Sequence, residues 1–184
     1  MTGKLICEAA LRGMYRFAKQ ASWLVTLTAA ISGAQSQQLP DSPKTAQVST
    51  LAREMLVAHN AIRAEVKVPP LVWSDQLANV AQKWADRLRD QHQFAHNPDS
   101  TYGENLFDIT GAAATSSVVV KRWASESLNY DYPSNTCKGI CGHYTQLVWR
   151  DSKRLGCAVA RGGGREVWVC NYDPPGNWLG QRPY

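Results

Sequence analysis

The stretch Leu155-Gly-Cys-Ala-Val-Ala-Arg-Gly-Gly-Gly-Arg-Glu-Val-Trp-Val-Cys-Asn171 decides the fold class of this chain. Its two halves, Leu155–Ala160 and Arg165–Asn171, are short, β-branched or aromatic, and alternating, which predicts two strands. The glycines of Gly162–Gly164 suit a tight turn, because glycine adopts positive φ angles without steric cost. The stretch therefore predicts a β-hairpin, and the similar pattern of His143–Trp149 predicts a third strand just before it.

Upstream of this hairpin the sequence is helical in pattern. Apolar residues three and four positions apart predict a helix from Ser49 that Pro69-Pro70 ends. A second helix is expected to begin at the N-cap pair Ser74-Asp75, and a third covers about residues 114–128. The expected buried face of the first helix is Leu51, Met55, Ala58, His59, Ile62 and Val66. Helices followed by an antiparallel sheet indicate an α+β layered domain.

Residues 1–34 have the layout of a secretory signal peptide. Basic residues precede an 11-residue apolar run, Ala21–Ile31, and the small residues Ser32 and Ala34 suit a cut after Ala34. The run is shorter than the roughly 20 residues that span a bilayer, although a permanent N-terminal anchor is the alternative. Residues 35–48 are polar and rich in proline, so we expect a flexible lead-in to a domain at residues 49–184.

Length and composition exclude several classes of protein. The chain has 184 residues, of which 44% are hydrophobic, and this suits one globular domain. Residues 1–34 hold four of the 20 basic residues and one of the 15 acidic ones, so the formal charge of +5 falls to +2 after cleavage. No basic run survives. We therefore expect a monomer that does not bind nucleic acid.

The cysteines agree with export. Cys7 leaves with the signal peptide, and the four that remain are Cys137, Cys141, Cys157 and Cys170. In an oxidising compartment these four are expected to form two disulfides, with three connectivities open. Zinc binding is the alternative, because Cys137, Cys141 and His143 crowd three potential ligands into seven residues.

Common catalytic motifs are missing from the sequence. Its four histidines, His59, His92, His96 and His143, do not occur in His-Glu-x-x-His. There is also no Gly-x-Ser-x-Gly, no phosphate-binding glycine loop and no dinucleotide fingerprint. Residue patterns alone thus stop at a secreted, disulfide-linked α+β domain.

Longer strings resemble a known family. The segments Gly142-His-Tyr-Thr-Gln-Leu-Val-Trp-Arg-Asp-Ser152 and Val167-Trp-Val-Cys-Asn-Tyr-Asp-Pro-Pro-Gly-Asn-Trp178 look like the two signatures of the CAP superfamily (cysteine-rich secretory proteins, antigen 5, pathogenesis-related 1; the SCP domain). Shorter matches follow the same order: His59–Arg63, Leu71–Asp75, Tyr102–Leu106 and Trp123–Glu126. The resemblance covers about residues 50–184 and is strongest to the plant pathogenesis-related 1 branch. It implies a three-layer α-β-α sandwich with an antiparallel sheet.

The resemblance also implies a central cleft lined by two histidines and two glutamates. By motif these are His96, Glu104, Glu126 and His143. Imidazole nitrogens are good ligands for zinc-like ions, and carboxylates can ligate directly or orient a ligand. A divalent metal such as zinc is therefore expected, held mainly by His96 and His143, with Glu104 and Glu126 lining the cleft.

For the cysteines, the resemblance implies the pairs Cys137–Cys141 and Cys157–Cys170. Plant members usually carry six cysteines, and the positions that match the third pair are here His92 and about Gly162. Both ends of that bridge are replaced together. The missing bridge should lower stability by at most a few kcal/mol.

Two further activities belong to the family that this chain resembles. One is binding of sterols or fatty acids by an aromatic loop, which matches Tyr130, Tyr132 and Pro133 through Ile140. The other is release of a C-terminal signalling peptide after Asp173, which would free Pro174–Tyr184.

The sequence therefore predicts an extracellular, apoplastic defence protein that acts on microbes by binding a sterol or another lipid, with no catalytic residues. Contact with a membrane surface would accompany such binding. One alternative is a metal-dependent hydrolase at His96 and His143 with Glu104 or Glu126 as base. The other is a precursor of the peptide at residues 174–184.

Overall fold

The computed structural model describes residues 49–184, so the predicted signal peptide (1–34) and lead-in (35–48) lie outside the described residues. In chain order the elements are α1 (Thr50–Glu65), β1 (Val72–Trp73), α2 (Asp75–Asp90), β2 (Gly103–Thr110), α3 (Ser116–Ala124), the 3-10 helix η1 (Ser125–Asn129), β3 (Tyr130–Asp131), β4 (Thr136–Cys137), α4 (Gly142–Leu147), β5 (Arg154–Gly162) and β6 (Arg165–Asp173). Within this range no helix combines the length and the apolar character needed to cross a membrane.

The predicted hairpin forms the centre of a four-stranded sheet with the order β1-β5-β6-β2. Gly162 pairs with Arg165, which leaves Gly163 and Gly164 as a two-residue turn with φ angles of 58° and 74°. Strand β2 is antiparallel to β6, but the two-residue β1 is parallel to β5. The sheet is thus mixed, where the sequence predicted an antiparallel one, because the short strand β1, which the sequence analysis did not predict, pairs in parallel with β5 at the edge of the sheet.

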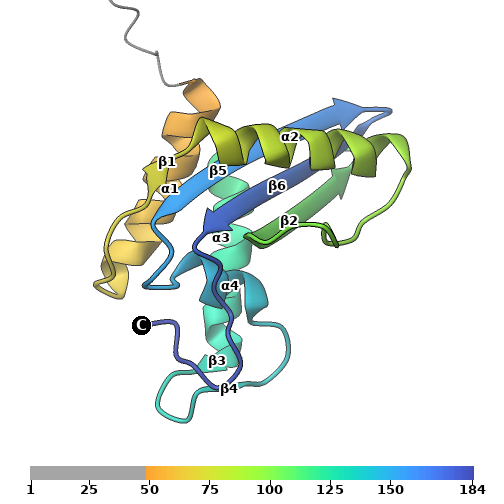
Figure 1. The fold of residues 1–184 in the computed structure, drawn as a ribbon. Coiled ribbons are helices and arrows are strands. Elements are labelled where there is room, and N and C mark those ends of the chain that lie inside the picture. The colour runs from red at the N-terminus through yellow and green to blue at the C-terminus, as the bar shows by residue number, and fades with distance from the viewer. Residues whose placement is uncertain (1–48) are drawn as a thin grey trace, which may run out of the picture. The chain divides into compact units, whose positions relative to one another are not determined.

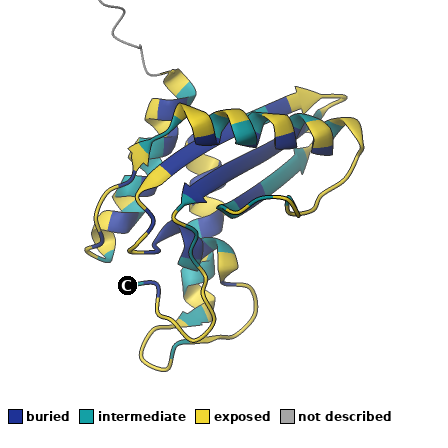
Figure 2. Cartoon of the chain, viewed as in Figure 1, coloured by how far each residue is buried: buried dark blue, intermediate teal, exposed yellow. Residues whose placement is uncertain are grey.

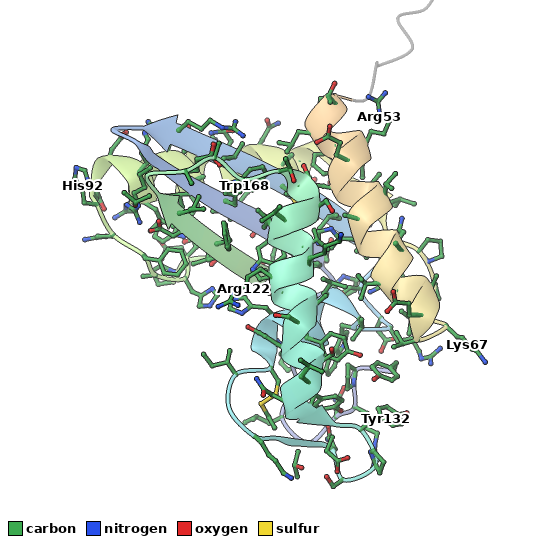
Figure 3. All side chains as sticks on the ribbon, turned by 180° about the vertical axis from the view of Figure 1, so that it is seen from behind. Arg53, Lys67, His92, Arg122, Tyr132 and Trp168 are labelled. Carbon is green, nitrogen blue, oxygen red and sulfur yellow. A yellow bond between two sulfur atoms is a disulfide. The ribbon has the colours of Figure 1, made fainter. Side chains whose placement is uncertain are left out.

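Helices cover both faces of the sheet, which confirms the predicted three layers (Figure 1). Helix α2 lies on one face, and α1 and α3 lie on the other, as the view from behind shows (Figure 3). The layer under α2 is built from Ala81, Trp84, Ala85, Leu88, Leu106, Ala158, Ala160, Val167 and Val169. The opposite layer includes Met55, Val119, Trp123, Leu147, Leu155, Cys157, Trp168, Cys170 and Tyr172. Strand β6, between these layers, holds the longest buried run among residues 49–184 (Figure 2).

Side-chain caps fix where the helices begin. Ser49 accepts a hydrogen bond from the Ala52 amide, and Ser74 accepts one from the Leu77 amide, as the sequence predicted for the second helix. Thr115 caps α3 in the same way. The helix expected over residues 114–128 is shorter than predicted, because the chain tightens into η1 after Ala124.

The prediction of a strand at His143–Trp149 is wrong, because this segment begins with helix α4. The buried residues Tyr144, Gln146 and Val148 alternate as in a strand. Tyr144, Leu147 and Val148 are also buried, and their spacing of three and four positions suits one face of a helix equally well. The Glu126 carboxylate decides between the two, since it accepts hydrogen bonds from the amides of His143 and Tyr144 in the first turn.

Strand β2 was not anticipated from the sequence. It starts with Gly103 and the polar residues Glu104 and Asn105, and Asp108 interrupts the apolar pattern further on. Asp108 faces Arg165 of β6, whose guanidinium donates hydrogen bonds to it. The strand is therefore stabilised by pairing with β6 and by this ion pair rather than by regular alternation.

Beyond the sheet, the β3–β4 hairpin and the last eleven residues form a smaller, more exposed region (Figure 2). We call Pro174–Tyr184 the C-terminal strap. It is attached through the Pro183 carbonyl, which accepts from the Arg150 amide at 2.7 Å, and through Asn177, which bonds to Thr145 and to the Gly142 carbonyl.

Both implied disulfides are confirmed. Cys157 and Cys170 are directly opposite one another on β5 and β6, and their bond is buried between the sheet and the α1–α3 layer. Cys137 and Cys141 close a short loop before α4, and Cys137 is exposed.

Candidate functional site

The four residues predicted to line a cleft form two hydrogen-bonded pairs. His96 Nδ1 lies 2.7 Å from Glu104 Oε1, and His143 Nδ1 lies 2.6 Å from Glu126 Oε1. In each pair the histidine is the more exposed partner. The side chain of His96 is 67% exposed and that of Glu104 is 5% exposed. We call these the two His–Glu pairs.

The first pair joins the loop after α2 to the start of β2. Glu104 Oε1 also accepts a hydrogen bond from the Asn97 amide at 3.1 Å, which fixes the loop that carries His96. The hydrogen bond that the His96 ring donates to the Glu104 carboxylate raises the pKa of His96 above its ordinary value. Within residues 49–184, Glu104 Oε2 is buried and has no hydrogen-bond partner. A buried carboxylate oxygen without a donor is a natural place for a cation or a bound water.

The second pair is held by the start of α4. Glu126 Oε2 accepts from the amides of His143 and Tyr144, at 2.9 and 3.3 Å, so the carboxylate both caps the helix and orients the imidazole. The His143 ring stacks on the buried Trp123, with ring centres 6.2 Å apart and planes inclined by 13°. The capping, the pairing and the stack together leave His143 few alternative orientations.

Asn105 connects this site to the interior. Its amide donates to the His143 carbonyl at 3.0 Å and to the Tyr172 hydroxyl at 3.1 Å. The Tyr172 hydroxyl in turn lies 2.9 Å from His59 Nε2, and His59 Nδ1 lies 2.8 Å from the Met55 carbonyl. This chain of hydrogen bonds runs from α1 through the core to the site.

Two basic side chains of α1 are fully buried. Burial lowers the pKa of His59 to about 4, so the imidazole is neutral at ordinary pH. Arg63 donates to the carbonyls of Pro69, Leu147, Trp149 and Ser152, and burial lowers its pKa to about 10. We call His59, Arg63, Asn105 and Tyr172 the core polar network. The sequence analysis expected His59 on the buried face but missed the other three, whose only signal was their place inside the family motifs.

A group of potential metal ligands that includes none of these four residues lies in the core. Among the described residues, the ligand atoms of His59, Cys157 and Cys170 all lie within 4.8 Å of one another. The two sulfurs are bonded to each other, and both nitrogens of His59 are hydrogen-bonded. This group is therefore structural. The alternative zinc site at Cys137, Cys141 and His143 fails for the same reason, since those sulfurs also form a disulfide.

The side-chain chemistry of the two His–Glu pairs suits a divalent cation, although within residues 49–184 no three ligand atoms from these four residues lie within 4.8 Å of one another. Within residues 49–184 the hydrogen bonds of His96 and His143 use Nδ1, which leaves Nε2 of each ring available. A carboxylate on the opposite ring nitrogen is the usual support for a metal-binding histidine, because it fixes the ring and makes it more basic. Each glutamate is hydrogen-bonded to Nδ1, the ring nitrogen opposite Nε2, which is the position of a supporting group rather than of a first ligand.

The aromatic loop packs on the end of the chain. The Tyr130 hydroxyl donates to Asn135 at 2.7 Å, and its ring contacts Tyr132 and Tyr144. The Tyr132 ring, 38% exposed, stacks on Tyr184 with ring centres 4.5 Å apart. Pro133 contributes its carbonyl, which accepts from Arg182 at 2.9 Å. Figure 3 places Tyr132 at the opposite end of the molecule from His92.

A groove of about 500 Å³ lies between this loop and the C-terminal strap. Its walls include Tyr130, Ile140, Trp149, Thr145, Trp178 and Leu179. Three of these apolar side chains face solvent: Ile140 is 66% exposed, Trp178 56%, and Leu179 fully. The groove therefore offers apolar surface beside hydroxyl and amide groups.

The positions of the missing third disulfide lie at the far end of α2. A side chain at Gly162 would contact Arg89, which is three residues before His92 in the chain. His92 is exposed and adopts a positive φ of 53° in the turn that ends the helix. Arg165 holds this end together without the bridge. It pairs with Gly162 in the sheet, and its guanidinium donates hydrogen bonds to the carbonyls of Leu88 and Gln93.

Comparison with known proteins gives one consistent result. Residues 56–172 match CAP, the cysteine-rich secretory protein family. The chain is 46% identical over 132 residues to "Pathogenesis-related protein 1" of Arabidopsis thaliana, covering 69% of this chain and 78% of that protein. It is 47% identical over 135 residues to "Pathogenesis-related protein 1A" of Nicotiana tabacum, covering 72% and 80%.

Solved structures show the same fold. Venom allergen-like protein 4 of Schistosoma mansoni superposes with a TM-score of 0.63 at 28% identity, over 74% of this chain and 94% of that one. A structure described as NaASP2 with Zn2+ superposes with a TM-score of 0.62 at 24% identity, over 76% and 88%. The second likeness concerns the fold alone.

Proposed function

This chain belongs to the cysteine-rich secretory protein (CAP) family, and from that premise we propose an extracellular defence protein of the pathogenesis-related 1 type that binds a sterol or a related lipid without turning it over. Relatives that share close to half of its residues carry the pathogenesis-related 1 name. Two disulfides suit an oxidising compartment, and the family name itself includes secretion. We propose that the protein acts as a monomer with lipid, not nucleic acid, as its partner.

The exposed apolar lining of the groove carries the lipid proposal. A domain of this size normally leaves single apolar side chains at its surface, whereas a cluster around a cavity indicates a binding site. Ile140, Trp178 and Leu179 form such a cluster beside Tyr130 of the aromatic loop. Tyrosine rings with one polar tip suit a ligand that is mostly apolar and carries one hydroxyl.

Titration of the secreted protein with cholesterol tests this proposal. Ile140→Ser should weaken binding by roughly fivefold, because it removes apolar contact area from the groove. Val72→Ser is the matched control, since Val72 is 59% exposed on β1 and is not among the residues that line the groove. Equal binding by both variants, or no binding by the unchanged protein, would refute lipid binding at the groove.

We also propose that Nε2 of His96 and of His143 bind a divalent cation such as zinc, with Glu104 and Glu126 holding the rings in place. A bound cation would supply a localised positive charge to attract an anionic or hydroxyl group. The support comes from the donor set: two oriented imidazoles and the unpartnered Glu104 Oε2.

Calorimetric titration with zinc tests the ion site. His96→Ala and His143→Ala should each weaken zinc binding by at least about tenfold, the size of effect seen when an oriented ligand is lost. His92→Ala is the matched control, because His92 is an exposed histidine outside both pairs. Zinc binding that His92→Ala abolishes and His96→Ala does not would overturn this assignment.

A metal-dependent hydrolase is the second candidate, and Glu104 is the residue that favours it. Its Oε2 is the buried carboxylate oxygen that lacks a hydrogen-bond partner in the described part of the chain, whereas both oxygens of Glu126 are already occupied by amides and His143. Glu104 would therefore serve as the base. Turnover of an ester or peptide library that Glu104→Gln abolishes would favour the hydrolase over the binding protein.

The C-terminal strap supports the peptide-precursor alternative. It leaves the sheet at the end of β6, and most of its residues are exposed. Mass spectrometry of secreted fluid after infection would detect a Pro174–Tyr184 fragment if the domain releases one. Its absence would refute the precursor role and leave the binding role intact.

A further inference from the structure

At the end of the C-terminal strap, the side chain of Tyr184 contacts two other tyrosines, next to the groove but not among the residues that line it. The Tyr184 ring lies parallel to the Tyr132 ring, with planes inclined by 7° and centres 4.5 Å apart. Its hydroxyl lies 3.0 Å from the Tyr144 hydroxyl. Tyr184 thus presents a flat apolar ring to one tyrosine and a single hydroxyl to another.

Hydrogen bonds from side chains to main-chain carbonyls hold this arrangement in place. The Tyr132 hydroxyl donates to the Tyr184 carbonyl, and Arg182 donates to the carbonyls of Tyr132 and Pro133. The Arg182 guanidinium also lies 5.8 Å from the centre of the Tyr132 ring. The side chains that would meet a lipid at the aromatic loop are therefore already engaged by the C-terminal strap.

Tyr144 is the hydrogen-bond partner of the Tyr184 hydroxyl. It is 6% exposed, and burial together with the hydrogen bond to Tyr184 raises its pKa, so the hydroxyl stays protonated and able to donate. A ligand hydroxyl that replaced the Tyr184 hydroxyl would find the same partner. A ligand without a hydroxyl would leave the Tyr144 hydroxyl unpaired in a buried place, which is unfavourable.

We infer that Tyr184 occupies the subsite for the hydroxyl-bearing ring of a sterol, with Tyr132 as the stacking face and Tyr144 as the hydrogen-bond partner. The inference rests on the proposed lipid binding and adds a site, a specificity residue and a built-in competitor. The strap must move away from Tyr132 before the sterol enters. Apparent affinity is then reduced by the fraction of molecules in which the strap is closed.

The test is cholesterol binding by full-length secreted variants. Tyr184→Ala should bind cholesterol roughly 3- to 10-fold more tightly than the unchanged protein, because it removes the competing ring. Tyr184→Phe keeps the ring and loses the hydroxyl, so its affinity for cholesterol should lie between those of Tyr184→Ala and the unchanged protein. Arg182→Ala loosens the strap at different atoms and should also increase affinity. Phe94→Ala removes an exposed aromatic ring elsewhere and should change nothing.

A second ligand tests the role of Tyr144. Cholest-5-ene has the same rings as cholesterol but no hydroxyl, so the Tyr184→Ala variant should prefer cholesterol by about tenfold. Adding Tyr144→Phe should remove most of that preference. Circular dichroism of each variant confirms that it is folded.

The outcomes separate this inference from the proposal beneath it. If the unchanged protein binds cholesterol and Tyr184→Ala binds it more weakly or equally well, the strap is either part of the site or irrelevant to it. That result would overturn this inference alone. No binding by any variant would overturn the proposed lipid function as well.

Discussion

The core polar network and the two His–Glu pairs use the same side-chain types in opposite ways. In the core, both ring nitrogens of His59 are hydrogen-bonded to protein atoms, and the Arg63 guanidinium donates to four main-chain carbonyls. Both residues are fully buried. At the surface, His96 and His143 are hydrogen-bonded through one nitrogen and reach solvent. A satisfied, buried group stabilises the fold, whereas a half-satisfied, exposed one is free to bind.

The largest effect is expected in the core. Arg63→Met should lower the free energy of unfolding by about 3–5 kcal/mol, because three buried carbonyls and the partly buried carbonyl of Pro69 lose their donor. Urea unfolding measures the loss. Arg53→Met, an exposed arginine on the same helix, should stay within about 0.5 kcal/mol. A loss below about 1 kcal/mol at Arg63 would show that this network does not stabilise the fold.

As the pH falls, the core histidine His59 should lower the stability of the fold before most carboxylates become protonated. The folded pKa of His59 is about 4 and its ordinary value is 6.5, so between these values the unfolded chain binds a proton that the folded one excludes. Stability should therefore fall as pH drops from 6.5 to about 4, by roughly 3 kcal/mol. His59→Gln should flatten this part of the unfolding free-energy curve. An unchanged slope in the variant would contradict the assignment.

The two disulfides extend the contrast between core and surface. Replacing Cys157 and Cys170 by serine should lower stability by about 3 kcal/mol, and replacing Cys137 and Cys141 by about 2 kcal/mol, since the second pair closes a shorter loop. Because Cys137 is exposed and the other pair is buried, mild thiol treatment of the folded protein should reduce the 137–141 bond first. Alkylation and mass mapping would detect the reverse order.

The smallest effect on intrinsic stability is expected at the surface pairs. His96→Ala should change the free energy of unfolding by less than about 1 kcal/mol, because the pair is largely exposed on the histidine side. Zinc at about 100 times its Kd should stabilise the unchanged protein by about 2.7 kcal/mol and the variant far less. Equal stabilisation of both proteins, measured by urea unfolding with and without zinc, would place the ion elsewhere.

Local sequence patterns were sufficient for the parts of the fold that depend on neighbouring residues. The glycine turn of the β5–β6 hairpin and the cap at Ser74 are set within a few positions, and both are confirmed. The disulfide pairing required more than local patterns, since four cysteines allow three connectivities. Resemblance to CAP proteins chose between them, and the structure agrees.

The parts that were missed depend on contacts between distant residues. Helix α4 is capped by Glu126, 17 residues before His143, so its own alternating pattern was misleading. The His59–Tyr172 hydrogen bond joins residues 113 positions apart. The stack of Tyr132 on Tyr184 likewise depends on where the strap returns. No window of the sequence contains both partners of these contacts.

The contrast between buried and surface histidines is tested most directly by NMR of the imidazole C–H groups during zinc titration. The chain has four histidines, so each signal can be assigned by single substitution. We predict that zinc shifts the signals of His96 and His143 together and leaves those of His59 and His92 in place. Zinc that shifts His59, or that shifts His92 while His96 and His143 stay fixed, would contradict the division of roles described here.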